Sequence, residues 1–89
     1  MKILKFGAVW CMNCIVMKRV WEEIEPLMPE LDTEYIDIDN DRDKTKEFKI
    51  VDEIPVFVFL DKTGKEFNRI VGQKSKEELI KFIKENLNK

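Results

Sequence analysis

The chain has 89 residues, of which 44% are hydrophobic and 38% are charged, and its formal net charge is −2. This length leaves room for a single domain, residues 1–89, with a modest core. A charge so near zero gives no electrostatic reason to expect nucleic acid or an anionic membrane as a partner. The apolar runs are too short for a membrane span or a secretion signal, so we expect a cytoplasmic monomer.

The first elements of the chain are predicted to be a strand and a helix. Residues 2–8 are mostly apolar and predict the strand, with Gly7 near its end. Residues 11–24 predict the helix, because apolar residues recur on one broad face suited to packing on a sheet. These apolar residues are Met12, Ile15, Val16, Met17, Val20, Trp21 and Ile24. Pro26 disfavours helical geometry at Glu25, so we expect the helix to end there.

A second strand and a short helix follow. Residues 33–38 predict the strand, and Asn40 or Asp41 can cap a helix that ends near Phe48. The acidic residues between the two elements are expected to form a solvated turn with helix-capping roles: Asp37, Asp39 and Asp41.

The next segment predicts a buried strand and a hairpin. Residues 54–60 are apolar on both faces, as in a central strand, and Pro55 can stand only at its start because proline cannot donate to the ladder. Residues 61–64 are a hairpin loop that leads into a strand over residues 65–71, which Gly72 ends.

The chain closes on a third helix. Ser75 and Glu78 have the spacing of a capping box at its start. Its apolar residues, expected to be buried, are Leu79, Ile80, Phe82, Ile83 and Leu87. The full order predicts an α/β fold with a four-stranded mixed sheet flanked by three helices. Its first two strands should be parallel with a right-handed crossover, and its last two antiparallel.

Both cysteines lie in the segment Trp10-Cys11-Met12-Asn13-Cys14, where the first strand passes into the first helix. A helix start presents unpaired N–H groups and the positive end of the macrodipole, which favour the reactive thiolate at Cys11. Cys14 lies one turn further on, points inward and can close a ring with Cys11. The segment therefore predicts reversible dithiol–disulfide chemistry; the alternative is a pair of inert buried cysteines.

The element order, the Trp-Cys-x-x-Cys segment and Ile54-Pro55, about forty residues after the second cysteine, together resemble the thioredoxin-like superfamily. The resemblance covers essentially the whole chain. The chain lacks the N-terminal strand and helix of a standard thioredoxin, and its size is closer to that of glutaredoxins and small archaeal-type thioredoxins.

The resemblance implies a thiol–disulfide oxidoreductase that reduces protein disulfides, with Cys11 as the nucleophile and Cys14 as the resolving cysteine. Pro55 is then a cis-proline that leaves the Ile54 backbone free to pair with substrate. The other expected substrate contacts are Trp10, Met12 and Gly72. The alternative for Trp10 is that it is an aromatic residue of the hydrophobic core. The resemblance implies no cofactor or metal beyond the redox-active disulfide. As partners it implies disulfide-containing proteins and a thioredoxin-reductase-type or other electron donor.

Three positions depart from the thioredoxin pattern. The dipeptide between the cysteines is Met12-Asn13, and Asn13 either donates to a sulfur or is a solvated first-turn residue. Lys5 stands where thioredoxins bury an aspartate; its ammonium either favours the Cys14 thiolate or reaches the surface. Arg19 replaces the usual helix proline, which predicts an uninterrupted first helix.

Three other functions stay open at this point. A glutathione-dependent glutaredoxin typically has Gly-Gly and an aspartate after the fourth strand, and residues 71–75 have neither. A Cu(I) chaperone shares the Cys-x-x-Cys but has a different element order, and zinc would need more ligands than two cysteines. The third is a binding module that has lost its redox activity.

Overall fold

The computed structural model describes residues 1–89, and its helices and strands follow the predicted order. Their ends lie within two residues of the expected ones, except that the last helix, expected to end the chain, stops at Glu85. The strands are β1 (Lys2–Gly7), β2 (Asp32–Asp37), β3 (Val56–Leu60) and β4 (Glu66–Val71). The helices are α1 (Met12–Ile24), α2 (Arg42–Glu47) and α3 (Lys76–Glu85), with a 3-10 turn, η1 (Glu25–Leu27), after α1. None of the helices combines the length and the apolar composition that crossing a membrane requires.

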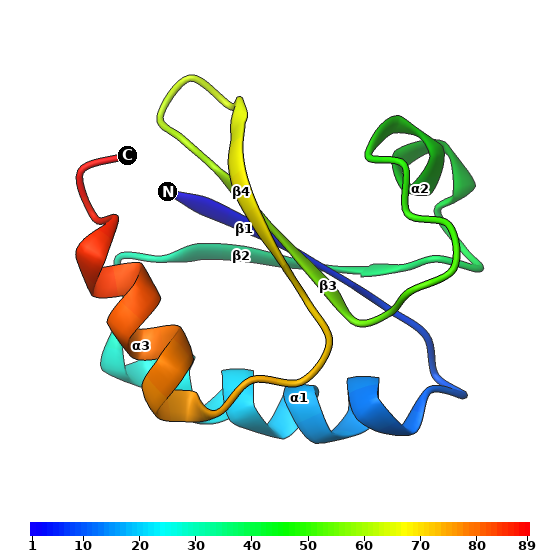
Figure 1. Ribbon diagram of the computed structural model, residues 1–89, viewed down its shortest axis with the longest axis horizontal. Coiled ribbons are helices and arrows are strands. Elements are labelled where there is room, and N and C mark those ends of the chain that lie inside the picture. The colour runs from blue at the N-terminus through cyan, green and yellow to red at the C-terminus, as the bar shows by residue number, and fades with distance from the viewer.

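The predicted mixed sheet is confirmed, with strand order β2-β1-β3-β4 (Figure 1). β1 pairs in parallel with β2 and antiparallel with β3, and β3 and β4 form an antiparallel hairpin. β3 is therefore a central strand, and all five of its residues are buried. The continuous apolar run of β3 follows from this position, because both of its faces are covered.

The two faces of the sheet are covered by different helices. In Figure 1, α1 and α3 lie on one side of the sheet and α2 on the other. Successive residues of β1 alternate between these layers. Ile3 packs with Trp21 of α1 and Leu79 of α3, whereas Leu4 and Phe6 belong to the cluster on the α2 side.

The expected caps are present and α1 ends at Ile24 as predicted, but the backbone geometry after it differs from the prediction. The Asp41 side chain accepts from Lys44 N, and Ser75 and Glu78 form a capping box. Glu25 has helical angles (φ −57°, ψ −43°), so the prediction that Pro26 ends helical geometry there is wrong. Pro26 lies in the first positions of η1, where the missing N–H costs nothing, and the chain tightens instead of leaving the helix. α1 itself is uninterrupted, as predicted.

Both long helices bury a narrower face than expected. The buried residues of α1 are Cys14, Met17, Trp21 and Ile24, and those of α3 are Leu79 and Ile83. Met12, Ile15 and Val16 are exposed, Ile80 and Phe82 are only partly buried, and Leu87 is exposed beyond the end of α3. A helix against one sheet face covers a stripe spaced by three or four residues, which leaves flanking apolar side chains in solvent.

Candidate active site

Cys11 is the residue that caps α1. Its backbone is extended (φ −94°, ψ 114°), and its N–H donates to Ala8 O at 3.2 Å. Its Sγ accepts a hydrogen bond from the backbone N–H of Cys14, also at 3.2 Å. The sulfur thus takes the place of an N-cap oxygen, at the helix end that stabilises negative charge. Both cysteines are free thiols.

Cys14 differs from Cys11 in its electrostatics and not in its exposure. The exposed fractions are 9% for Cys11 and 8% for Cys14, so the expected contrast between an outer and an inner cysteine is absent. Burial, followed by the hydrogen bond with Cys11, raises the pKa of Cys14 from 9.0 to about 12, against an opposing hydrogen bond from the Ala8 backbone. Cys14 therefore keeps its proton at neutral pH.

Gly7 lets the sheet approach the active site closely. A Cβ atom at Gly7 would lie 3.3 Å from Cys14 Cβ, 3.3 Å from Cys14 Sγ and 3.3 Å from Tyr35 Cε1. These distances are tighter than ordinary van der Waals contacts, so the position suits a residue without a side chain. Tyr35 was not among the predicted site residues. The signal that could have found it is the parallel pairing of β1 and β2, which sets Tyr35 opposite Lys5.

Ile54, Pro55 and Gly72 come together beside the cysteines. The Ile54-Pro55 peptide bond is cis, as the resemblance implied, and Pro55 is buried. Gly72 N donates to Pro55 O at 2.8 Å. The Ile54 side chain packs against the cluster of Ala8, Cys11 and Cys14. The backbone N–H and C=O of Ile54 make no backbone hydrogen bond in the chain and stay free.

Trp10 is 64% exposed, so the alternative of a core aromatic is wrong. Its indole Nε1 donates to Asp39 Oδ2 at 2.8 Å, and Asp39 N in turn donates to Asp37 Oδ1. Asp39 therefore has a specific partner that the prediction of a solvated turn missed. A signal was available, because the parallel strands β1 and β2 end at the same sheet edge, just before Trp10 and Asp39.

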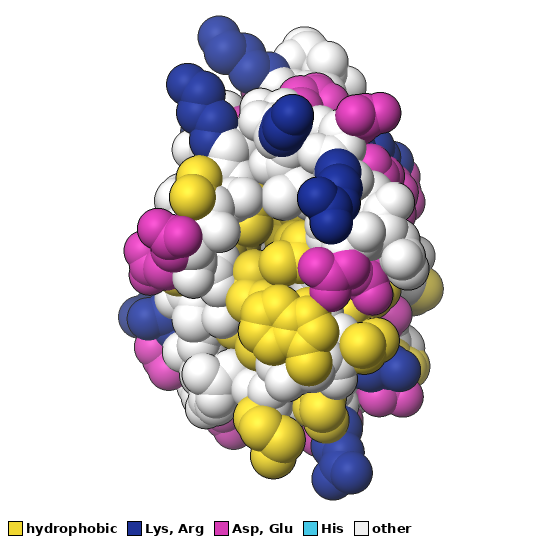
Figure 2. All heavy atoms as spheres, turned by 90° about the vertical axis from the view of Figure 1, so that its right-hand side faces the viewer, with side chains coloured by type: hydrophobic (Ala, Val, Ile, Leu, Met, Phe, Trp, Pro, Cys, Tyr) yellow, Lys and Arg dark blue, Asp and Glu magenta, His cyan; other side chains and the backbone are white.

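An apolar surface surrounds the cysteines. Figure 2 faces the end of the molecule where α1 begins, and hydrophobic side chains gather in its centre. The exposed apolar residues of the Cys-x-x-Cys segment and its approach are Val9, Trp10 and Met12. Asn13 makes no hydrogen bond to a sulfur; instead its Oδ1 accepts from Gln73 Nε2 at 2.6 Å. This contact joins the first turn of α1 to the segment that follows Gly72.

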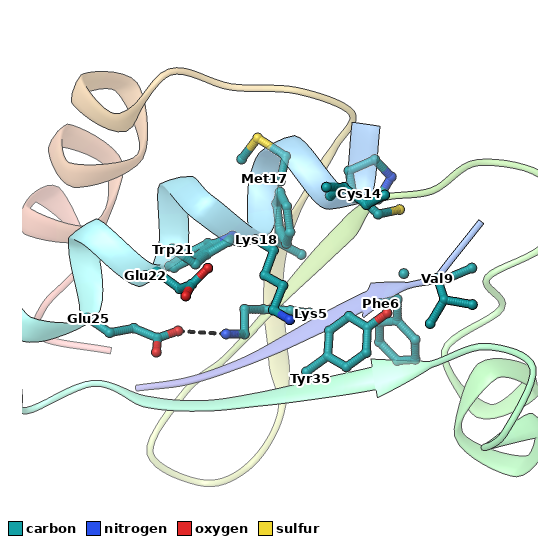
Figure 3. Close-up of a pocket in the computed structure, with 15 residues that line it drawn as sticks. Lys5, Phe6, Val9, Cys14, Met17, Lys18, Trp21, Glu22, Glu25 and Tyr35 are labelled. Atoms are coloured by element: carbon teal, nitrogen blue, oxygen red, sulfur yellow. Dashed lines mark hydrogen bonds and ion pairs between the residues drawn. The ribbon is translucent and has the colours of Figure 1, made fainter. Parts of the chain in front are cut away.

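Lys5 and Cys14 line the same pocket, of about 550 Å³, between α1 and the edge of the sheet (Figure 3). The Lys5 side chain is only 16% exposed, and its Nζ lies 2.6 Å from Glu25 Oε2. Thr33 Oγ1 donates to the same carboxylate oxygen at 3.1 Å. The Lys5 side chain is thus mostly covered, and its ammonium ends on a partly exposed carboxylate and not on Cys14. An effect of its ammonium on Cys14 stays a hypothesis, since the ammonium is directed to Glu25.

Comparisons with known proteins agree on one family. The thioredoxin family model matches residues 1–85. Thioredoxin from Chlamydia trachomatis is 35% identical over 81 residues, which are 91% of this chain and 78% of that protein. An H-type thioredoxin from Fagopyrum esculentum is 36% identical over 81 residues, or 91% of this chain and 67% of that protein.

Solved structures give the same result. The crystal structure of a thioredoxin from Nicotiana alata superposes with a TM-score of 0.85 at 36% identity, covering 94% of this chain and 70% of that one. Thioredoxin 1 of Thermosipho africanus gives 0.83 at 26% identity, covering 98% and 94%. The observed element order also differs from that of the copper chaperone alternative, and none of these comparisons favours a glutaredoxin. The chain therefore belongs to the thioredoxin family and is a thiol–disulfide oxidoreductase.

Proposed function

We propose that the chain reduces protein disulfides through a reversible Cys11–Cys14 dithiol/disulfide pair. The Cys11 thiolate attacks one sulfur of the substrate disulfide, forms a mixed disulfide and releases the first substrate thiolate. Cys14 then loses its proton and attacks Cys11 Sγ. A lone pair of Cys14 forms the Cys11–Cys14 bond, the bond between Cys11 and the substrate breaks, and its electron pair leaves on the second substrate sulfur as a thiolate.

The observation that carries this assignment is the asymmetry between the two sulfurs. Cys11 Sγ accepts an N–H at the positive end of α1, where a thiolate is stabilised. Cys14 keeps its proton, because its pKa is about 12. The first sulfur is thus suited to attack, and the second waits until the mixed disulfide brings a target within reach.

The surface around the cysteines supports binding of an extended peptide. The free N–H and C=O of Ile54 can pair with a substrate backbone beside Pro55 and Gly72. Exposed Trp10 and Met12 offer apolar contact next to Cys11. We assign these five residues to substrate binding.

The proposal extends to partners and location. The substrates are disulfide-containing proteins, and the electrons come from a thioredoxin-reductase-type or other donor. The two sulfurs carry the electrons themselves, so the proposed cycle uses no cofactor. A dithiol that must be returned to its reduced form suits a reducing compartment such as the cytoplasm, where we expect the chain to act as a monomer.

Single-cysteine variants test the roles directly. Cys14→Ser should trap a mixed disulfide with a test protein that carries one disulfide, whereas Cys11→Ser should trap none; mass spectrometry reads both. Equilibration of the unmodified chain with dithiothreitol and glutathione couples measures the reduction potential. Steady turnover with glutathione alone would favour a glutaredoxin. Failure of the cysteines to form a disulfide, or trapping through Cys14 instead of Cys11, would contradict the proposal.

A further inference from the structure

We propose that Tyr35 is a positioning residue for the Cys14 proton. The Tyr35 hydroxyl donates a hydrogen bond to the Cys14 sulfur through a water molecule in the pocket whenever that sulfur carries negative charge. The inference rests on the proposed function, since it concerns the resolving cysteine. It adds a residue on β2 to a site otherwise built from α1 and the segments around Ile54 and Gly72.

The bare backbone of Gly7 brings the ring and the sulfur together. A Cβ at Gly7 would lie 3.3 Å from both Cys14 Sγ and Tyr35 Cε1, so these two atoms are separated by at most twice that distance. Cε1 is bonded to the carbon that carries the hydroxyl. No Gly7 side chain stands between them. A polar contact at this range is typically completed by one water.

The pocket gives this water a place. Tyr35 and Cys14 both line it, and Tyr35 is 50% exposed, so solvent reaches its hydroxyl. In Figure 3 the Tyr35 oxygen points away from Glu25, toward the end of the pocket where Val9 and Cys14 lie. The hydroxyl is therefore on the side of the pocket from which the sulfur can be reached.

The charges around Tyr35 keep it a donor. Burial, together with the carboxylates of Asp37 and Asp39 and the two cysteines, raises its pKa above the ordinary value of 10.0. The ammonium of Lys5, its register partner, is bound to Glu25. The remaining charged residues of the pocket, Lys18 and Glu22, project from α1. Tyr35 thus stays protonated and can donate to a charged sulfur across the neutral range.

Such a donor matters because Cys14 is a poor leaving group. When an external thiolate attacks Cys11 Sγ of the oxidised chain, the Cys11–Cys14 bond breaks and its electron pair passes to Cys14. The charged sulfur, which burial disfavours, is stabilised by the donated hydrogen bond and then takes a proton from water. In the opposite direction the same contact helps Cys14 release its proton to water before it attacks. Tyr35 therefore speeds both directions.

Tyr35→Phe tests this inference, because it removes one oxygen atom and keeps the ring. Thr33→Val is the matched control: it removes a hydroxyl from the same face of β2, one that donates to Glu25 instead. Stopped-flow measurements follow reduction of the oxidised chain by dithiothreitol, and closure of the Cys11–Cys14 disulfide from a preformed mixed disulfide, between pH 6 and 10. The midpoint of thermal unfolding and the reduction potential are measured beside them.

We expect Tyr35→Phe to slow both reactions by about tenfold, the size of one hydrogen bond to a charged group, and to move the pH profile of closure upward. The potential at pH 7 should not change, because Cys14 is protonated in the reduced chain. Thr33→Val should leave both rates as they are. Equal rates in Tyr35→Phe and the unmodified chain, or equal losses in the two variants, would overturn the inference. If the unmodified chain forms no disulfide, the proposed function fails first, which is a separate result.

Discussion

The Sγ atom of Cys11 and the backbone N–H of Cys14 are joined by a 3.2 Å hydrogen bond, so each cysteine fixes the position of the other. The bond places the Cys11 sulfur over the first turn of α1, and the Cys14 thiol faces Gly7 and the pocket. The reactivity of the pair follows from this placement, and so do the predictions below.

The raised pKa of Cys14 predicts that the reduced chain loses stability as pH rises from about 9 to about 12. In this window the Cys14 thiol ionises in the unfolded state but keeps its proton in the folded state. The unfolded state therefore binds fewer protons, and rising pH stabilises it relative to the folded state. The free energy of unfolding should fall by a few kcal/mol, on the order of 1.4 kcal/mol for each unit of pKa shift. Urea unfolding of the reduced chain at several pH values measures this loss.

Cys14→Ala is the control for that measurement. Tyr35, whose pKa is raised above 10.0, also ionises at high pH. The variant keeps this and every other contribution while removing that of the Cys14 thiol. The comparison concerns the slope of stability against pH, because the substitution lowers stability by itself at every pH. An identical slope in the two proteins would show that Cys14 ionises with its ordinary pKa.

The Trp10–Asp39 hydrogen bond predicts an effect on substrate binding. Asp39→Ala frees the indole that is held at 2.8 Å, and the exposed ring then loses its fixed orientation beside Cys11. We expect KM for a protein disulfide to rise about fivefold, the size of one hydrogen bond of about 1 kcal/mol, with kcat little changed. Reduction of a small disulfide should be unaffected, since it needs no apolar platform. Asp32→Ala, at the other end of β2, should change neither value.

The close approach at Gly7 predicts that Gly7→Ala is destabilising. The new methyl group would meet the Cys14 sulfur and the Tyr35 ring at 3.3 Å, so one of them must shift. We expect a loss of about 1–3 kcal/mol and a changed rate of Cys14 alkylation. Gly64→Ala, where no atom lies within 4 Å but φ is +86°, separates crowding from backbone strain. It should cost about 1 kcal/mol and leave the thiols unchanged; a matching change in thiol reactivity would refute the crowding argument.

The Lys5–Glu25 pair predicts a coupling in stability. Lys5→Met leaves the half-buried Glu25 carboxylate with Thr33 as its one partner, which should lower the free energy of unfolding by about 1 kcal/mol. Adding Glu25→Gln to the same chain removes the unpaired charge and should restore most of this stability. Urea unfolding of the two single variants and the double variant measures the coupling. Titration of Cys14 in Lys5→Met tests the other role: an unchanged pKa would dispose of the hypothesis that the ammonium favours the thiolate.

Local patterns were sufficient for most of the architecture. The apolar run of β3, the capping box of Ser75 and Glu78 and the Asp41 cap depend on neighbouring residues, and each is confirmed. The errors concern how far an apolar face is covered. Leu87 and Val16 have the right periodicity, but the sheet does not extend over them. The prediction that Pro26 ends helical geometry at Glu25 was wrong for another reason, because the chain tightens there into the 3-10 turn η1.

The amino-acid sequence by itself determined the element order, the helix caps and the position of both cysteines at a helix start, since each follows from contacts within a few residues. Only the tertiary structure decided that Trp10 bonds to Asp39, Asn13 to Gln73, and that Tyr35 lies beside Cys14 across Gly7. These residues are far apart in the chain. Their meeting depends on the parallel register of β1 and β2 and on how the segment after β4 packs against α1, which no local pattern encodes.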